Sequence, residues 1–358
     1  METTQSNEIR RTLSAPPDAI PPVAIDGIIF SLQRHGGISV YFRELLARMP
    51  QGTELYLEDT LLQTPPEVSA LNVKRRAARL GERYRACRLE GSATVFHSSY
   101  YRPPQRHCPT VVTVHDFVYE RFARGPRRWV HSLQKLNSIR GADAIVCVSN
   151  ATLHDLHHFV GVRPHQRVYT IYNGVGSVFR PIETESAERP FFLFVGHRAG
   201  YKNFALVAQA LRHLKDVDLV CVGGGPLLAN ELHGLSESER ARIHQPANVS
   251  DTELNALYNQ ALCLVYPSRY EGFGIPVIEA MRAGCPVIST DCDAVREIAS
   301  SARIEVDPHD APELARQIDG LRDAALRGFF SRAGFEVAAK FSWDDSCRRL
   351  MGVYRNLA

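Results

Sequence analysis

Residues 265–290 read VYPSRYEGFGIPVIEAMRAGCPVIST, and they combine a strand, a glycine loop, a short helix and the start of the next strand. Gly272 and Gly274 lack the Cβ atoms that would keep a ligand away from the backbone. Pro276 suits the first position of a helix, and Gly284 suits its end. The free N–H groups at that helix start form an anion site, which the helix dipole strengthens. The stretch therefore predicts a βαβ unit with a phosphate-binding turn.

Two carboxylates, Glu271 and Glu279, accompany this turn and are eight residues apart. A carboxylate only accepts hydrogen bonds, so beside an anion site it is suited to holding hydroxyl groups. A pocket for phosphate and several hydroxyls together describes a nucleotide sugar. The plainer interpretation is an ordinary βα turn with two surface glutamates.

The pattern E-G-F-G-I-P-V-I-E-A-M-x-A-G-x-P-V-I, at residues 271–288, closely resembles the donor-site signature of family 4 glycosyltransferases. The resemblance implies that Glu271 and the Gly272–Gly274 backbone hold sugar hydroxyls and that Glu279 holds the ribose. It implies the following donor-binding residues: Gly36, Gly37, Gly272, Phe273, Gly274, Ile275 and Glu279.

The composition is that of a globular protein with room for two domains of ordinary size. The chain has 358 residues, of which 44% are hydrophobic and 23% are charged. No apolar run is long enough to span a membrane. The first 22 residues are polar and proline-rich, which predicts a disordered tail rather than a signal peptide. Eight cysteines without C-x-x-C spacing favour reduced thiols and a cytoplasmic location.

A net charge of +3 is too small to imply a nucleic-acid partner, but the charge is uneven. Seven basic residues lie between Lys74 and Arg88, against Glu82 alone. A second basic cluster, Arg121, Arg124, Arg127 and Arg128, adjoins Trp129. Either the segment from Lys74 to Arg88 is a solvated helix face, or it is a patch that contacts the anionic inner membrane peripherally.

Short apolar runs alternate with helical patterns along the chain, which predicts α/β architecture with parallel sheets. The first run, at residues 23–30, is expected to be a buried strand. Residues 174–190 interrupt the alternation with glycines and prolines, and residues 191–195 restart it. We therefore expect two Rossmann-like βαβ domains facing across a cleft. The expected parts are a tail at 1–22, an N-terminal acceptor domain at 23–180, a linker at 181–190, a C-terminal donor domain at 191–340, and a helix at 341–358 that packs back on the first domain.

Ligands of such folds sit at the carboxyl ends of the strands, where four further segments fall. Each also has a plain structural interpretation, as a tight turn, a structural histidine or an exposed loop. The His-Asp pair can fix a histidine tautomer and point the ring into a cleft. Two cations beside a glycine before a helix suit a diphosphate. The segments are Gly36-Gly37, His115-Asp116, residues 196–203 (GHRAGYKN) and residues 223–226 (GGGP).

Five segments occur in the order typical of family 4 glycosyltransferases: Gly36-Gly37-Ile38, His115-Asp116, Asn173-Gly174-Val175, the loop at residues 196–203, and the segment from Glu271 to Glu279. The resemblance therefore covers nearly everything after residue 22 and implies the two-domain GT-B fold. Residues 26–33 (DGIIFSLQ) and 199–204 (AGYKNF) look most like bacterial enzymes that build O-antigen or other surface polysaccharides. There is one departure from the family pattern. Many members carry arginine directly after the loop glycine, where this chain has His197, so either His197 or Arg198 takes that role.

The resemblance implies a retaining transferase that acts on a nucleoside-diphosphate sugar and a glycan or lipid-linked acceptor. Arg198 and Lys202 are the candidates for stabilising the departing diphosphate, supported by the amides of Gly36, Gly37 and Gly274. His115 and Glu271 would contact the sugar. No residue is evident as an enzymatic nucleophile, consistent with the front-face substitution proposed for the family. The subgroup slightly favours GDP-mannose over UDP-sugars and other GDP-sugars.

Two functions from other classes remain open: a nucleotide-sugar epimerase on the same scaffold, and a non-catalytic subunit that binds nucleotide sugars. We expect no divalent metal and no cofactor. Asp291-Cys292-Asp293 matches the D-x-D pattern of metal-dependent glycosyltransferases, but that pattern belongs to a different fold. Asp293 is expected to be the N-cap of the helix that follows.

Overall fold

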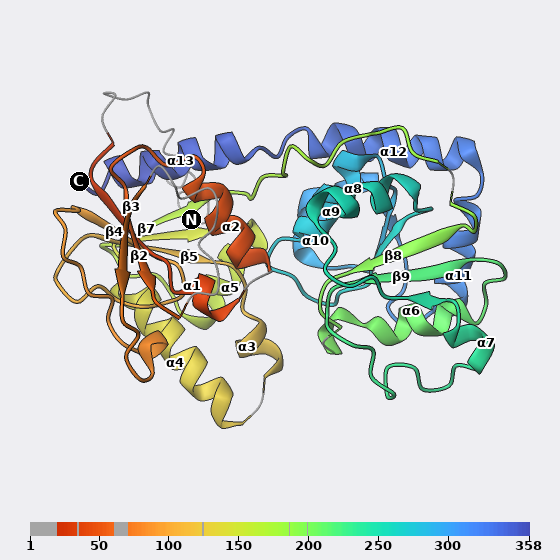
Figure 1. Ribbon diagram of the computed structural model, residues 1–358, viewed down its shortest axis with the longest axis horizontal. Coiled ribbons are helices and arrows are strands. Elements are labelled where there is room, and N and C mark those ends of the chain that lie inside the picture. Colours follow the sequence, from red (N-terminus) through yellow and green to blue (C-terminus); the bar gives the residue numbers. More distant parts are fainter. Residues whose placement is uncertain (1–19, 34–35, 61–70, 124, 186, 199) are drawn as a thin grey trace, which may run out of the picture.

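A computed structural model describes residues 20–33, 36–60, 71–123, 125–185, 187–198 and 200–358, without the side chains of 126–128. Most of the expected N-terminal tail, together with His35, Arg124 and Ala199, lies outside the described residues. Figure 1 shows two α/β halves side by side.

The first half contains a seven-stranded sheet in the order β3-β2-β1-β4-β5-β6-β7, and every described pair of neighbours is parallel. Its strands are β1 (Val23–Asp26), β2 (Glu54–Glu58), β3 (Asn72–Arg76), β4 (Val95–Ser98), β5 (Thr110–Val114), β6 (Ala144–Cys147) and β7 (Arg167–Thr170). Its helices are α1 (Ile29–Leu32), α2 (Gly37–Leu46), η2 (Glu82–Tyr84), α3 (Val118–Phe122), α4 (Pro126–Gly141) and α5 (Asn150–Phe159).

The second half contains a six-stranded sheet in the order β10-β9-β8-β11-β12-β13, again parallel throughout its described pairs. Its strands are β8 (Phe191–Val195), β9 (Asp218–Val222), β10 (Ile243–His244), β11 (Leu264–Tyr266), β12 (Val287–Ser289) and β13 (Ile304–Glu305). Its helices are η3 (Gly200–Lys202), α6 (Phe204–Leu211), α7 (Glu237–Arg240), α8 (Asp251–Gln260), α9 (Ile275–Ala283), α10 (Asp293–Ala299), η4 (Ser300–Ala302), α11 (Ala311–Gly320) and α12 (Ala324–Ala338).

The prediction of two Rossmann-like halves is therefore confirmed, and its physical basis is the strand composition. The central strands β1, β5, β6 and β8 are buried along their whole length, as parallel strands covered by helices on both faces must be. Parallel strands need a crossover connection, and the helical patterns between the apolar runs supply it.

The last helix, α13 (Trp343–Arg355), returns from the second half to the first (Figure 1). Trp343, Leu350 and Tyr354 belong to the same buried cluster as Phe42 of α2. The hydroxyl of Tyr354 also lies 2.7 Å from Nδ1 of the buried His97 on β4. The C-terminal helix thus completes the core of the first domain.

The expected strand at residues 23–30 is too long, because β1 ends at Asp26 and α1 starts at Ile29. The cause lies in the turn between them. A Cβ at Gly27 would come within 2.8 Å of the Tyr56 carbonyl oxygen, and the Gly27 amide donates to that oxygen. The carboxylate of Asp26 then accepts from the amide of Ile28 at 3.2 Å, which starts the turn.

The interpretation of Lys74–Arg88 as a helix face is also wrong. Residues 72–76 form the edge strand β3, and only Glu82–Tyr84 of the remainder is helical, as one 3₁₀ turn. The edge strand β3 reads NVKRR. Its arginines and lysine replace the alternation of apolar and polar side chains that would have predicted a strand.

Candidate functional site

Loops at the carboxyl ends of the two sheets contact each other between the domains. Gly272, in the loop after β11, packs against the backbone of His115, and a Cβ there would overlap the His115 carbonyl oxygen. A Cβ at Gly37, at the start of α2, would lie 3.9 Å from Cδ1 of Ile275 in the other domain. Four residues expected to share a site are therefore brought together from both domains.

Helix α9 begins directly after the glycine loop, as the sequence indicates. Gly274 is its N-cap with φ of 110°, and Gly284 is its C-cap with φ of 84°, conformations that favour glycine. Pro276 occupies the second helical position rather than the first. The amides of the first turn are directed away from the helix, which gives an anion site at the carboxyl end of β11.

Lys202 and Glu271 form an ion pair between the loops that follow β8 and β11. The Lys202 ammonium also donates to the Tyr266 hydroxyl at 3.2 Å. Both charged side chains are largely buried, with 13% and 11% of their surfaces exposed. The cation expected at the diphosphate and the carboxylate expected at the sugar therefore lie in direct contact, and a bound ligand at this place would interact with both.

Arg198 has a different set of partners from the one that the sequence suggests. Its guanidinium pairs with Glu231 at 3.0 Å, and 2% of the side chain is exposed. It donates to the carbonyl oxygens of Gly223, Gly224, Gly225 and Pro226. A hydrogen bond to a charged group contributes about 1.5–3 kcal/mol. Turning Arg198 toward a ligand would break several such bonds and lose their contributions. The expected role at the diphosphate is not supported, and the adjacent His197 is exposed.

Glu279 lies on the buried side of α9. Its carboxylate accepts from the Tyr258 hydroxyl of α8 at 3.4 Å. Burial raises the pKa of Glu279 to about 8, with a smaller contribution from Asp251. A ligand that donates hydrogen bonds to this carboxylate would stabilise its ionised form.

His115 follows β5, and its ring packs edge-on against Tyr41 of α2, with the ring centroids 5.0 Å apart. Its Nε2 atom is buried and has no hydrogen-bond partner. Burial lowers the pKa of His115 to about 4, so the ring is neutral at physiological pH. Among the described residues no hydrogen bond joins the side chains of the expected His-Asp pair, and the Asp116 carboxylate accepts from the Val118 amide at 3.0 Å. The orphaned nitrogen suits a hydroxyl group of a ligand.

Phe273 belongs to the core rather than to the pocket. Its ring is 4% exposed and packs edge-on against Phe341, with Tyr172 close by. The backbone of Phe273 is therefore a better candidate for ligand contact than its side chain. Gly36 precedes α2 in an extended conformation that is open to any residue, so it is not constrained to be glycine by its own dihedral angles.

Several interdomain contacts are absent from the sequence-based expectations. The Gly272 carbonyl accepts from Ser149 Oγ at 2.6 Å and from Thr152 Oγ1 at 3.0 Å. Glu297 of α10 accepts from the amides of Asn150 and Ala151, the first residues of α5. A strand followed by Ser-x-x-Thr could have indicated the N-cap at Ser149, which also bonds its own helix. No local signal points to Glu297.

The D-x-D carboxylates are both bound by Arg296. Its guanidinium contacts Asp291 at 2.6 Å and also pairs with Asp293. The expected N-cap role of Asp293 is wrong, because Cys292 is the N-cap of α10 and no side chain caps that helix. Among the described residues, no three His, Cys, Asp or Glu side chains gather as ligands for a metal ion.

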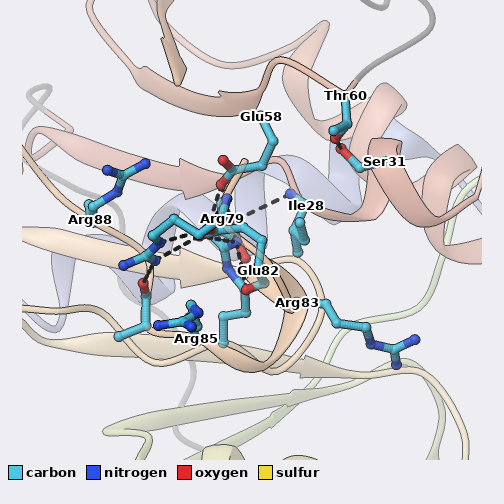
Figure 2. A network of polar contacts seen from close by, with 12 residues as sticks. Ile28, Ser31, Glu58, Thr60, Arg79, Glu82, Arg83, Arg85 and Arg88 are labelled. Atoms are coloured by element: carbon cyan, nitrogen blue, oxygen red, sulfur yellow. Dashed lines mark hydrogen bonds and ion pairs between the residues drawn. The ribbon is translucent and has the colours of Figure 1, made fainter. Parts of the chain in front are cut away.

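The basic segment at residues 74–88 has several of its guanidinium groups tied up within the domain. Arg79 pairs with the buried Glu82 at 2.7 Å, and Glu82 also lies 3.2 Å from the buried Arg102. Figure 2 shows Glu58, Arg79 and Glu82 in this network and Arg83 directed away from it. The only acidic residue of the segment is thus internal, so its surface carries cations and apolar groups.

Part of that surface is apolar and continues onto α4. The Gln134 side chain of α4 donates to the Arg83 carbonyl at 2.6 Å, which joins the two elements. Of the second basic cluster, Arg121 is not free, because it pairs with Asp155 and lies over the Tyr270 ring. The exposed apolar residues on the two elements are Leu80 (94% exposed), Tyr84 (54%), Trp129 (75%), Val130 (50%) and Leu133 (60%).

Comparison with known protein families gives matches to both domains. Residues 177–325 match the family described as "Glycosyl transferases group 1", and residues 35–177 match "Glycosyltransferase Family 4".

In the part of the chain that the structure describes, no helix combines the length and the apolar character needed to cross a bilayer.

Individual proteins give the same picture. The chain is 34% identical over 287 residues to O-antigen chain mannosyltransferase B of Escherichia coli, covering 74% of each protein. It is 27% identical over 275 residues to the serotype-specific mannosyltransferase WbdA of Escherichia coli, which covers 69% of this chain and only 33% of that longer protein. Among solved structures, sucrose-phosphate synthase from Thermosynechococcus elongatus superposes with a TM-score of 0.76 at 20% identity, covering 94% of this chain and 99% of that one. The last likeness concerns the fold alone.

Proposed function

Because the chain belongs to the family 4 glycosyltransferases of the GT-B fold, we propose that it is a retaining hexosyltransferase of surface polysaccharide synthesis. Its donor is GDP-mannose and its acceptor is a glycan or a lipid-linked glycan. The observation that carries the proposal is the pairing of Lys202 with Glu271 beside the N-terminus of α9. The names of the Escherichia coli relatives support mannose as the sugar.

The donor's negative charge is placed at Lys202 and the first amides of α9. When the bond between the sugar C1 and the diphosphate breaks, charge accumulates on the leaving oxygen. A fixed cation and preorganised amides stabilise that charge without reorganising during the reaction. Gly37, at the start of α2, lies close to Ile275 at the start of α9. The amides of Gly36 and Gly37 are proposed to contribute further donors.

The sugar and the ribose are placed at the neutral and acidic groups. Glu271 accepts from sugar hydroxyls once the donor separates it from Lys202, and the buried Nε2 of His115 bonds another hydroxyl. Glu279 holds the ribose hydroxyls. The acceptor hydroxyl forms the new bond to C1 on the face that the diphosphate leaves, and its proton passes to the leaving diphosphate oxygen. This scheme needs no enzymatic nucleophile and no divalent metal.

The acceptor also suggests where the protein works. We place it on the cytoplasmic side of an anionic membrane, in peripheral contact through the surface around Arg83 and Arg85. The apolar residues Leu80 and Trp129 on the same surface, exposed by 94% and 75%, support this placement. Near anionic lipid each basic residue contributes about 1 kcal/mol.

A thermal-shift panel of GDP, UDP and their sugars tests the donor. A ligand at 100 times its dissociation constant adds about 2.7 kcal/mol of apparent stability, so the preferred nucleotide should raise the Tm more than the others. No stabilisation by any nucleotide would contradict the proposal. The alternatives of an epimerase and a non-catalytic subunit both bind the donor, and they are separated by the products.

A further inference from the structure

Arg198 joins two loops at the carboxyl edge of the second sheet. It lies in the loop after β8, and its acceptors form the loop after β9, residues 223–226. Nη1 donates to the Gly223 carbonyl at 3.0 Å, and Nη2 donates to the Gly225 and Pro226 carbonyls at 2.7 and 2.8 Å. The Arg198 side chain itself is 2% exposed, whereas the acceptor residues Gly223, Gly225 and Pro226 are exposed.

The β9 loop cannot hold this shape through ordinary side-chain packing. Gly223, Gly224 and Gly225 all have positive φ, of 84°, 79° and 71°, and such a run carries a large entropic cost when it is ordered. A Cβ at Gly224 would lie 2.7 Å from Nη1 of Arg198 and 2.9 Å from the Gly196 carbonyl oxygen. The loop is thus fitted around the guanidinium group, with Gln245 donating to the same carbonyls from the far side.

Glu231 completes the arrangement. One of its carboxylate oxygens accepts from Nε of Arg198 at 3.0 Å, and the other accepts from the Leu228 amide at 2.8 Å. Glu231 therefore holds the guanidinium in the plane that reaches the glycine carbonyls. Lys202 lies four residues after Arg198, at the end of the η3 turn that follows the same strand β8.

We infer that Arg198 is a positioning residue, which fastens the β8 loop to the glycine loop and so fixes Lys202, and that it does not contact the donor diphosphate. This inference rests on the proposed function for the role of Lys202, while the anchoring itself does not. The opposite view, a diphosphate-binding Arg198, makes different predictions for Glu231. If Arg198 bound the diphosphate, Glu231→Gln would release its guanidinium, and the variant enzyme would keep or gain activity. A positioning arginine loses its anchor, so activity falls.

The chain offers a matched control in Arg242. Its guanidinium also bonds three backbone carbonyls, those of Leu211, Leu214 and Val217, but it leads into β10 at the opposite, amino edge of the sheet. A purely structural arginine that caps carbonyls should affect stability at either edge. Only the carboxyl-edge arginine should affect the site.

The experiment compares Arg198→Lys, Arg198→Ala, Glu231→Gln and Arg242→Ala in the full chain. Amide hydrogen exchange of a peptide spanning residues 222–228 should speed up by roughly 10-fold in both Arg198 variants, because local opening becomes easier. It should stay unchanged in Arg242→Ala. With GDP-mannose, both Arg198 variants should lose about 100-fold in kcat/KM, mainly in kcat, and Glu231→Gln should fall in the same direction.

The double variant Arg198→Ala/Lys202→Ala should be no less active than Lys202→Ala alone, because Arg198 acts through Lys202. Near wild-type turnover of Arg198→Lys, higher activity of Glu231→Gln, or unchanged exchange in the Arg198 variants would each overturn the inference. Absence of turnover in the wild-type chain would contradict the proposed function instead, and the exchange measurement would still decide whether Arg198 anchors the loop.

Discussion

Lys202 and Glu271 neutralise each other across two neighbouring strand ends. The pair keeps a cation and a carboxylate buried together, which is tolerated because each is the other's partner. A nucleotide sugar would substitute for both partners at once, with phosphate at the ammonium and hydroxyls at the carboxylate. The ion pair therefore holds the two groups near the positions in which the proposed donor needs them.

Replacing Lys202 by alanine should lower kcat/KM with GDP-mannose by at least about 100-fold, because one preorganised cation is lost from the leaving group. Glu271 is then left without its cation, so Lys202→Ala/Glu271→Gln should restore stability without restoring turnover. The exposed Lys340 provides the control, and its alanine variant should behave like the wild type. Undiminished turnover of Lys202→Ala would exclude the lysine from the reaction.

Glu279 should make stability depend on pH. Burial raises its pKa to about 8 from an ordinary 4.5, so the folded chain favours the neutral acid. The stabilisation from this group is complete below pH 4.5 and is lost as the pH rises through 8. The Tm of Glu279→Gln minus that of the wild type should therefore increase between pH 5 and pH 8. Glu237→Gln, on the exposed surface of α7, should show no such trend.

The same residue should couple nucleotide binding to proton release. Ribose hydroxyls donate to the ionised carboxylate, so bound nucleotide lowers the pKa of Glu279 and expels its proton near pH 7. Calorimetry of GDP binding in buffers with different ionisation enthalpies should detect this proton, and Glu279→Gln should abolish it. Identical proton release by the variant would place the ribose elsewhere.

Turnover should persist in excess EDTA. Lys202 and the start of α9 already provide positive charge for the diphosphate, and Arg296 occupies both Asp291 and Asp293. The Asp293→Asn variant should stay active, because the substitution removes no more than an ion pair at the protein surface. Activity that disappears in chelator and returns only with magnesium or manganese would show that a metal takes part.

Anionic vesicles should bind the protein through the apolar and basic surface of the first domain. Flotation with phosphatidylcholine and phosphatidylglycerol should be weakened by salt, which screens charges beyond about 8 Å at physiological ionic strength. Leu80→Ser and Trp129→Ser should reduce binding. Leu228→Ser, exposed by 57% on the second domain, should not. Equal, salt-insensitive binding to neutral vesicles would argue that the surface is merely solvated.

Local chemistry explains which parts of the fold the sequence could predict. Gly274 and Gly284 mark the ends of α9 because their positive φ values are set within a few residues. Ser250 and Glu253 form a complete capping box at α8, again a relationship between near neighbours. The central strands were predictable because burial on both faces demands continuous apolar runs.

Distant partners explain the remainder. From the sequence alone, Arg198 could bind either a ligand or other groups of the protein. Its actual partner, Glu231, is 33 residues away in the sequence. Asp293 fits an N-cap by position, but Arg296 competes for its carboxylate. Among the described strands, β3 at the sheet edge pairs with β2 alone, and its arginines and lysine hide the strand pattern. In each case a tertiary contact outweighs the local preference.

The central claim is hexosyl transfer with retention, and one measurement tests it most directly. The protein is incubated with GDP-mannose and a panel of mannosyl oligosaccharide and lipid-linked acceptors, and the products are followed by NMR. We predict that GDP appears in step with a new α-linked mannosyl signal, because retention keeps the configuration of the donor. A β-linked product would contradict retention. Conversion of GDP-mannose into another nucleotide sugar, or binding without any turnover across the panel, would contradict the transferase itself.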